Sequence, residues 1–125
     1  MSEKHLIIEM DPVPKGRPRF TRTGHAFTDK KTRDAEKYIR DLALAEWGKT
    51  PFSGPVILNI FFTFSKPKSN KKPNHTQRPD LDNCIKLVSD AINGVGFSDD
   101  CQIVGLSGVK AWGENGLIDV WVKEV

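Results

Sequence analysis

Acidic residues gather in two short segments of the chain, together with one lysine. The first segment is Asp80-Leu81-Asp82-Asn83-Cys84-Ile85-Lys86, and the second is Ser98-Asp99-Asp100-Cys101-Gln102. Carboxylate oxygens are the ligands that hard cations such as Mg²⁺ prefer. A divalent cation can activate water for phosphodiester hydrolysis, and a nearby lysine can stabilise the negative charge that develops. The pattern is therefore typical of a metal-dependent nuclease.

The charge of the chain is unevenly distributed. Residues 1–79 hold 16 Lys and Arg against 8 Asp and Glu, a net charge of +8. Residues 80–125 hold 3 against 8, a net charge of −5, which agrees with +3 overall. Clustered Lys and Arg suit the phosphate backbone of nucleic acids. A basic frame around an acidic centre is what a phosphodiester-cutting site would need.

The elements that must position these residues follow from the hydrophobic pattern. Helical spacing predicts helices over residues 29–47 and 80–93, and alternation predicts strands over residues 5–10, 56–64, 102–112 and 117–123. The second strand is apolar on both faces, which predicts a central position. Asn115-Gly116 indicates that the last two strands form an antiparallel hairpin. We expect one α+β domain over residues 1–125, in β-α-β-α-β-β order, with two helices packed on a mixed sheet.

The predicted second helix places its charged residues on one side. If Leu81, Ile85, Val88 and Ile92 form its core stripe, then Asp82, Lys86 and Asp90 line up on the exposed side. Asp80 stands at the helix start, so its carboxylate and that of Asp82 can converge beside the N-terminus. Asp99 or Asp100 leads into the next strand and can complete an oxygen shell for Mg²⁺.

A purely structural interpretation of the same residues stays open. An Asp before a helix is a common cap, and Lys86 can form an ordinary ion pair with Asp90. A calcium-binding EF-hand loop starting at Asp80 is excluded, because it would need Gly at Ile85 and Glu at Ala91. Zinc binding has little support, since the three histidines are scattered singly.

Two basic segments, residues 11–28 and 65–78, show neither helical nor strand periodicity. We expect them to hold the DNA backbone largely without reading sequence. Phe20 can instead stack on an unpaired base. The candidate DNA-binding residues are Lys15, Arg17, Arg19, Phe20 and Arg22 in the first segment and Lys68, Lys71, Lys72 and Arg78 in the second.

The composition is that of a soluble globular protein. The 125 residues are 38% hydrophobic and 28% charged, enough for one core. The apolar run Leu6-Ile7-Ile8 is far too short for a signal peptide or a membrane span, so we expect a cytoplasmic protein. Cys84 and Cys101 lack a metal-binding or redox spacing, and we expect both to be reduced.

Three motifs together closely resemble the RusA family of Holliday junction resolvases. They are Arg78 to Lys86, which follows the family pattern D-x-D-N-x-x-K, then Asp90 to Gly94, and then Asp99 to Ile103, which follows D-D-x-Q-[IV]. The early Pro14-Lys15-Gly16-Arg17-Pro18-Arg19 also looks like the family's basic segment, so the resemblance spans nearly the whole chain. Cys84 departs from the family, which usually has an aliphatic residue there.

The resemblance implies a bacterial or prophage-encoded homodimer that resolves four-way DNA junctions by paired nicks, in recombination and repair. It implies Mg²⁺, with Mn²⁺ as a possible substitute. Asp80, Asp82 and Asp100 match the family's metal-binding aspartates, and Lys86 matches its catalytic lysine. Asp99, like Asp90, is an accessory candidate.

Two other functions remain open from the residues. One is a related Mg²⁺-dependent nuclease acting on flaps or other branched DNA. The other is a non-catalytic DNA-binding protein whose carboxylates only stabilise helix and strand ends, although caps alone would not require Lys86 or Asp100.

Overall fold

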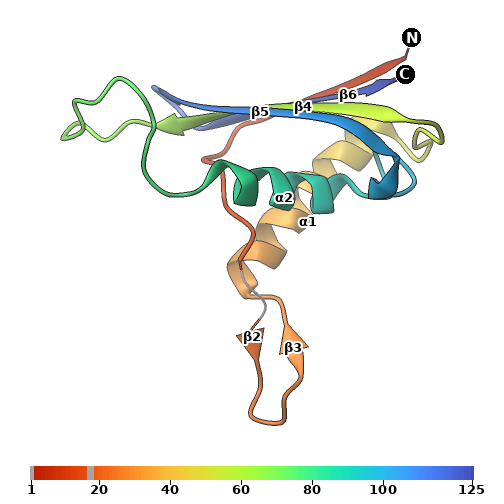
Figure 1. The fold of residues 1–125 in the computed structure, drawn as a ribbon, viewed down its shortest axis with the longest axis horizontal. Helices are drawn as coiled ribbons and strands as arrows, with labels where there is room; N and C mark the ends of the chain where they lie inside the picture. Colours follow the sequence, from red (N-terminus) through yellow and green to blue (C-terminus); the bar gives the residue numbers. More distant parts are fainter. Residues whose placement is uncertain (1, 17–18) are drawn as a thin grey trace.

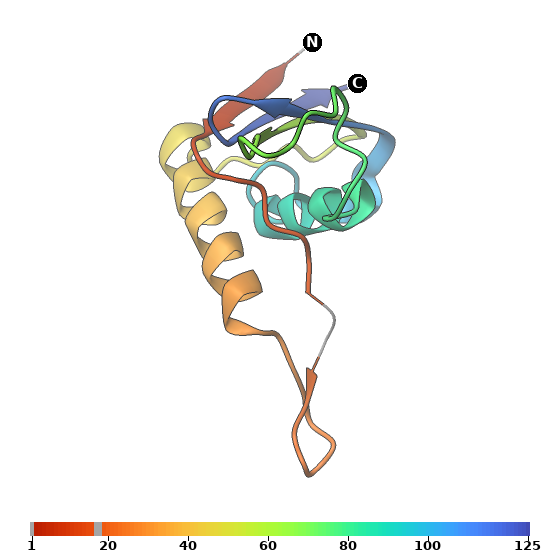
Figure 2. The ribbon, with the colours of Figure 1, turned by 90° about the vertical axis from the view of Figure 1, so that its left-hand side faces the viewer.

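The computed structural model describes residues 2–16 and 19–125, and Arg17, one of the candidate DNA-binding residues, lies outside them. A four-stranded mixed sheet carries two helices on one of its faces (Figures 1 and 2). The α+β fold and the predicted order of its main elements are confirmed. None of the helices in these two ranges is long and apolar enough to cross a membrane.

The sheet has the strand order β1-β6-β4-β5, with β1 at Glu3–Ile8, β4 at Val56–Ser65, β5 at Ile103–Gly113 and β6 at Leu117–Glu124. Strand β4 pairs in parallel with β5 and antiparallel with β6. The predicted central strand is therefore confirmed. Its inward side chains, from Val56 to Phe64 at alternate positions, are buried in the core, whereas Phe61 on the other face is half exposed.

The two C-terminal strands run in opposite directions across a short turn, but they are not neighbours. Strand β4 lies between β5 and β6, so the turn that joins β5 to β6 crosses the end of β4. There the backbone N–H of Lys66 donates a hydrogen bond to the carbonyl of Gly113. The apolar strand β4 gains a partner along both edges in this way. A two-residue hairpin at Asn115-Gly116 would pair β5 directly with β6. In this fold each of the two strands pairs with β4 instead.

Helix α1 spans Lys30–Trp47 and is capped by Asp29, whose carboxylate accepts a hydrogen bond of 2.7 Å from the backbone N–H of Thr32. Helix α2 spans Leu81–Ile92 and is followed by Gly94 at a φ of 86°. Both helices are confirmed to within a residue. A short 3₁₀ helix, η1, at Asp100–Gln102 then leads into β5.

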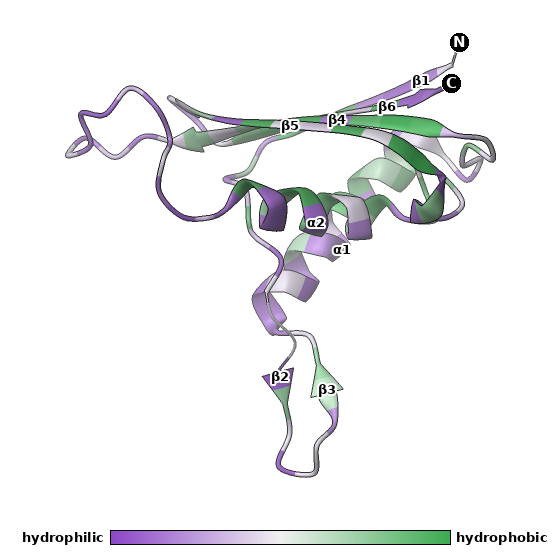
Figure 3. Ribbon diagram, in the orientation of Figure 1, coloured by the Kyte–Doolittle hydropathy of each residue, from purple (hydrophilic) through white to green (hydrophobic). Residues whose placement is uncertain are grey.

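The first basic segment contains structure that the sequence pattern did not predict. Strands β2 at Arg19–Phe20 and β3 at Ala26–Phe27 pair as a small antiparallel hairpin that projects from the body (Figure 1). Its strands are exposed, so they have no buried face to produce alternation. The hairpin and residues 66–79, which contain most of the second basic segment, are largely hydrophilic projections, whereas β4 in the centre of the sheet is hydrophobic (Figure 3).

Candidate active site at the start of helix α2

Helix α2 buries a wide face against the sheet and leaves its acidic residues outside. The buried residues are Cys84, Leu87, Val88, Ala91 and Ile92, while Leu81 and Ile85 are half-buried. The core stripe is thus rotated from the predicted one toward Cys84. Asp82 and Lys86 are exposed, as expected, and Asp90 is half-buried.

Close packing on β5 fixes the position of α2. A Cβ atom at Gly108 would lie 2.5 Å from Cδ1 of Ile85 and 3.5 Å from Cδ1 of Leu81, so a larger residue there would force the Ile85 side chain to move. Burial raises the pKa of the Cys84 thiol to about 11. This thiol is accordingly a packing group of the core.

Lys110 of β5 anchors the chain just before the helix. Its ammonium donates hydrogen bonds to the carbonyl oxygens of Gln77 at 2.7 Å and Pro79 at 3.0 Å. These bonds position Asp80, the next residue. Lys110 is not among the residues predicted from the sequence. The signal that could have indicated it is a lysine on the inward face of a strand, between Gly108 and Trp112.

The carboxylates of Asp80 and Asp82 are free for a ligand. Asp80 occupies the N-cap position, yet its side chain makes no capping hydrogen bond. Within residues 2–16 and 19–125, no ion pair involves either residue. Two uncommitted carboxylates two residues apart are a donor set that suits a hard cation. The structural interpretation of Asp80 as a helix cap is not supported by this geometry.

Lys86, by contrast, forms an ion pair with Asp90, which lies one helical turn further along α2. Its ammonium lies 3.3 Å from a carboxylate oxygen of Asp90, so the ion pair left open by the sequence is formed. The Lys86 side chain remains 60% exposed, and such an exposed pair contributes little stability. Lys86 can therefore exchange Asp90 for a bound phosphate at small cost.

Lys15 is committed to a different structural role. Its ammonium lies 3.0 Å from Glu36 and 3.1 Å from Asp90, and its backbone N–H donates to the carbonyl of Asn83. Burial would lower the pKa of Lys15, but the hydrogen bonds to Glu36 and Asp90 outweigh it, so the pKa lies above its usual value. Lys15 ties the first basic segment to both helices.

Asp99 and Asp100 lie at the opposite end of α2. They precede β5, whose first residue Ile103 pairs with Val56 at the start of β4, whereas Lys110 contacts the start of α2 seven residues further along the strand. The 12-residue helix between them is about 18 Å long at ~1.5 Å per residue. Figure 1 shows the start of α2 and the turn into β5 at opposite ends of the helix.

The expectation that Asp100 completes the shell around Asp80 and Asp82 is thus not met within one chain. No group of three His, Cys, Asp or Glu side chains in the described part of the chain is placed to hold a metal ion. The parallel pairing of β4 with β5 is the cause, since the connecting helix must run from one end of the sheet to the other.

Gln102, the polar residue of the second motif, acts structurally. Its side-chain amide donates to the carbonyls of Phe52 at 2.9 Å and Gly54 at 2.7 Å, and its amide oxygen accepts from the backbone N–H of Asp99. A hydrogen bond with the Cys101 thiol lowers the pKa of Asp99. These bonds hold the turn that presents Asp100, whose side chain is exposed.

The remaining basic candidates lie on two exposed projections. Arg19, Phe20 and Arg22 belong to the β2–β3 hairpin, and Phe20 is 69% exposed. The residues of the second projection, within residues 66–79, are Lys68, Lys71, Lys72 and Arg78. The start of α2 lies between these projections (Figures 1 and 2).

Comparison with known proteins places this arrangement in a family. The model of the family described as endodeoxyribonuclease RusA matches residues 9–123, which include both acidic motifs. The chain belongs to the RusA family. This RusA-family chain is also 32% identical over 130 residues to a Bacillus subtilis (strain 168) protein named uncharacterized protein YqaN, with 92% of each chain covered. The family match identifies the chain as a member of a family of DNA-cutting nucleases, so the non-catalytic alternative loses its support.

Proposed function

We propose that this protein is a Mg²⁺-dependent endonuclease that resolves four-way DNA junctions by paired, symmetric nicks, acting as a homodimer in DNA recombination and repair. The observation that carries the proposal is the pair of uncommitted carboxylates, Asp80 and Asp82, at the start of α2 between two basic projections. Family membership supports the nuclease class.

Asp80 and Asp82 would hold the metal ion, which when bound supplies Lewis acidity and an activated water. Lys110 keeps the Asp80 carboxylate in place through the backbone before it. Lys86 leaves Asp90 and moves its charge to the phosphate as negative charge develops there. The exposed arginines and lysines of the two projections hold the flanking backbone.

A second copy of the chain accounts for Asp100. Because α2 separates Asp100 from Asp80 and Asp82, a two-fold dimer in which each Asp100 reaches the partner's helix start would assemble all three carboxylates twice. Such a dimer also supplies the two sites that symmetric cutting of a junction needs.

The test uses purified protein with a four-way junction, a flap and a linear duplex of matched sequence, each with Mg²⁺ and with chelator. We expect paired nicks in the junction, in Mg²⁺ only. Preferential flap cutting would favour the flap nuclease instead, and binding without cutting under all metal conditions would contradict both.

Asp82→Asn sharpens the assignment. We expect this variant to bind the junction like the wild type and to lose cleavage by at least about 100-fold, since a metal ligand is removed. Asp34→Asn is the control, because Asp34 is an exposed helical residue paired only with Lys30 among the described residues. Wild-type cleavage by Asp82→Asn would rule out the metal assignment.

A further inference from the structure

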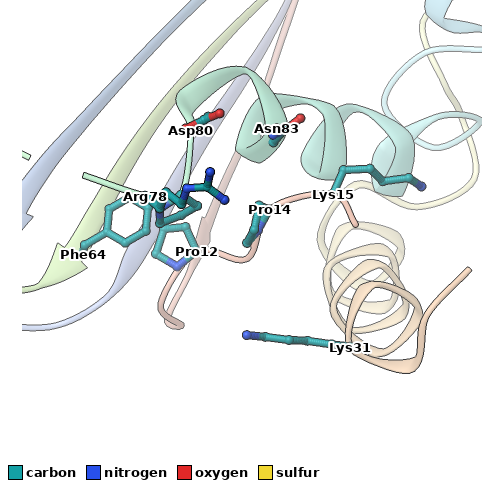
Figure 4. Close-up of a pocket in the computed structure, with 9 residues that line it drawn as sticks. Pro12, Pro14, Lys15, Lys31, Phe64, Arg78, Asp80 and Asn83 are labelled. Carbon is teal, nitrogen blue, oxygen red and sulfur yellow. The ribbon is translucent and has the colours of Figure 1, made fainter. Parts of the chain in front are cut away.

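A pocket opens beside the candidate metal ligands, on the side of Asp80 that faces helix α1. Its volume is about 440 Å³. Four segments build it, namely the chain after β1, the end of β4, the start of α2 and the first turn of α1 (Figure 4). The lining residues are Pro12, Pro14, Lys15, Lys31, Phe64, Arg78, Pro79, Asp80 and Asn83.

The chain between β1 and β2 is held tightly enough to make a fixed wall. Besides the bond from Lys15 to Asn83, the backbone N–H of Gly16 donates to the hydroxyl of Thr32 at 3.0 Å. A side chain at Gly16 would collide with the carboxylate of Asp29. The pocket is therefore anchored to both helices.

One part of the pocket is apolar. Pro12, Pro14 and Phe64 contribute their rings to its lining, and Figure 4 shows Pro12 beside Phe64. The Phe64 ring is itself supported from behind, because its centroid lies 4.3 Å from that of the buried His75. Such a surface accepts the face of an aromatic ring.

The rim of the pocket carries unneutralised cations. Lys31 and Arg78 are exposed, and neither forms a salt bridge with any residue in the ranges 2–16 and 19–125. Asn83 adds an amide with both a donor and an acceptor. A ligand that matches all of these features combines a flat ring, hydrogen-bonding edges and an anionic group.

We propose that the pocket receives one nucleotide that is displaced from its base pair at the branch point of the DNA, adjacent to the phosphate that is cut. Its base would lie against Pro14 and against those edges of the largely buried Pro12 and Phe64 rings that line the pocket, with its own edge toward Asn83, and its phosphate would lie near Lys31 and Arg78. The volume is within the range of ~300–1,000 Å³ typical of small-molecule sites. This inference rests on the proposed function and adds to it the group of the substrate that is recognised.

Such a pocket would give selectivity for branched DNA. A base inside a duplex must be unpaired and unstacked before it can enter, which costs a few kcal/mol, and this cost is lowest where pairing is already interrupted. At the branch point of a four-way junction the bases are paired, but the regular stacking of the duplex is interrupted, so a base there can leave its pair at a lower cost than a base inside a duplex arm.

The test combines a change in the pocket with removal of one base of the DNA and compares their separate and joint effects on binding. The affinity for the junction is measured in the presence of chelator, so that no cleavage occurs. Asn83→Phe fills the pocket mouth while keeping the backbone carbonyl that Lys15 contacts. Asn115→Phe, an equivalent change at an exposed turn residue outside the pocket, is the control. An abasic nucleotide is moved through the positions around the branch.

At one position near the scissile phosphate, we expect base removal to weaken binding by the wild type and by Asn115→Phe about tenfold, as expected for loss of one stacked base. Binding by Asn83→Phe should be weakened already and should not respond to base removal. Lys31→Ala should weaken binding of the intact junction more than Lys30→Ala, which removes the same charge from a lysine that is paired with Asp34. Thermal unfolding confirms that each variant is folded.

Equal effects of base removal on the wild type and on Asn83→Phe at every position would overturn the pocket assignment. Cleavage assays in Mg²⁺ separate the two levels of the account. A wild type that cuts junctions but shows no such coupling refutes the pocket alone, whereas a wild type that neither binds nor cuts junctions refutes the proposed function and the pocket with it.

Discussion

Lys110 on strand β5 donates a hydrogen bond of 3.0 Å to the carbonyl oxygen of Pro79, directly before the candidate ligand Asp80. This bond joins the sheet to the start of α2. Lys110 is therefore a positioning residue for the Asp80 carboxylate. It acts through the backbone before Asp80 and, among the residues that the structure describes, forms no hydrogen bond with that carboxylate.

Lys110→Met keeps the length of the side chain and removes the two hydrogen bonds. We expect junction cleavage to fall by about tenfold to 100-fold, because small displacements of a reacting group are costly. The Mg²⁺ concentration needed for half-maximal rate should rise, a shift that a general loss of stability would not produce. Lys123→Met, on the other face of the sheet, should leave both quantities unchanged.

We expect His75 to make the stability of the fold depend on pH. Its ring is 5% exposed and stacks on Trp112 at 4.1 Å between centroids, and its Nδ1 has no hydrogen-bond partner among the described residues. Burial, and secondarily the charge of Lys110, lower the pKa of His75 below its usual value of 6.5. The neutral ring is therefore the form that the fold favours.

The free energy of unfolding should consequently decrease as the pH falls below about 6.5, where the unfolded chain binds the proton more readily than the folded protein. Urea unfolding from about pH 8 to pH 5 measures this slope. His75→Phe retains an aromatic ring and should flatten the part of the slope that His75 causes. An unchanged slope in that variant would assign the pH dependence to other groups.

The second basic projection should set part of the salt dependence of DNA binding. Lys71 and Lys72 are exposed in residues 66–79, and each phosphate contact contributes about −0.9 to the slope of log K against log salt. Replacing both by Ala should reduce the slope by about 2. Lys37→Ala is the control, since Lys37 pairs with Asp41 on α1. An unaltered slope in the double variant would remove these lysines from the interface.

Helix α2 shows what the sequence alone could predict. Its apolar spacing, the Asp before it and Gly94 after it defined the helix to within one residue, and the exposure of Asp82 and Lys86 followed from that periodicity. The shift of the buried stripe to Cys84 did not follow. It depends on Gly108, a residue on a separate strand that lets the helix approach.

The placement of Asp100 and Lys15 could not be predicted because both depend on contacts between distant segments. Asp100 follows α2 closely in sequence, but the parallel pairing of β4 and β5 sends it to the far end of the helix. Lys15 looked like one more phosphate-binding residue of a basic loop. Its partners Glu36 and Asp90 lie on two different helices, and only their packing shows that its charge is already neutralised.

The most direct test of the whole account mixes two variants, Asp82→Asn and Asp100→Asn, each expected to be inactive alone. If the site combines Asp82 of one chain with Asp100 of the partner, a mixed dimer contains one site that carries both changes and one that is fully intact. Random exchange of subunits should then restore about a quarter of wild-type junction nicking, on one strand per dimer, in Mg²⁺. A mixture in which mixed dimers form but cleavage stays as low as in either variant alone would contradict the account.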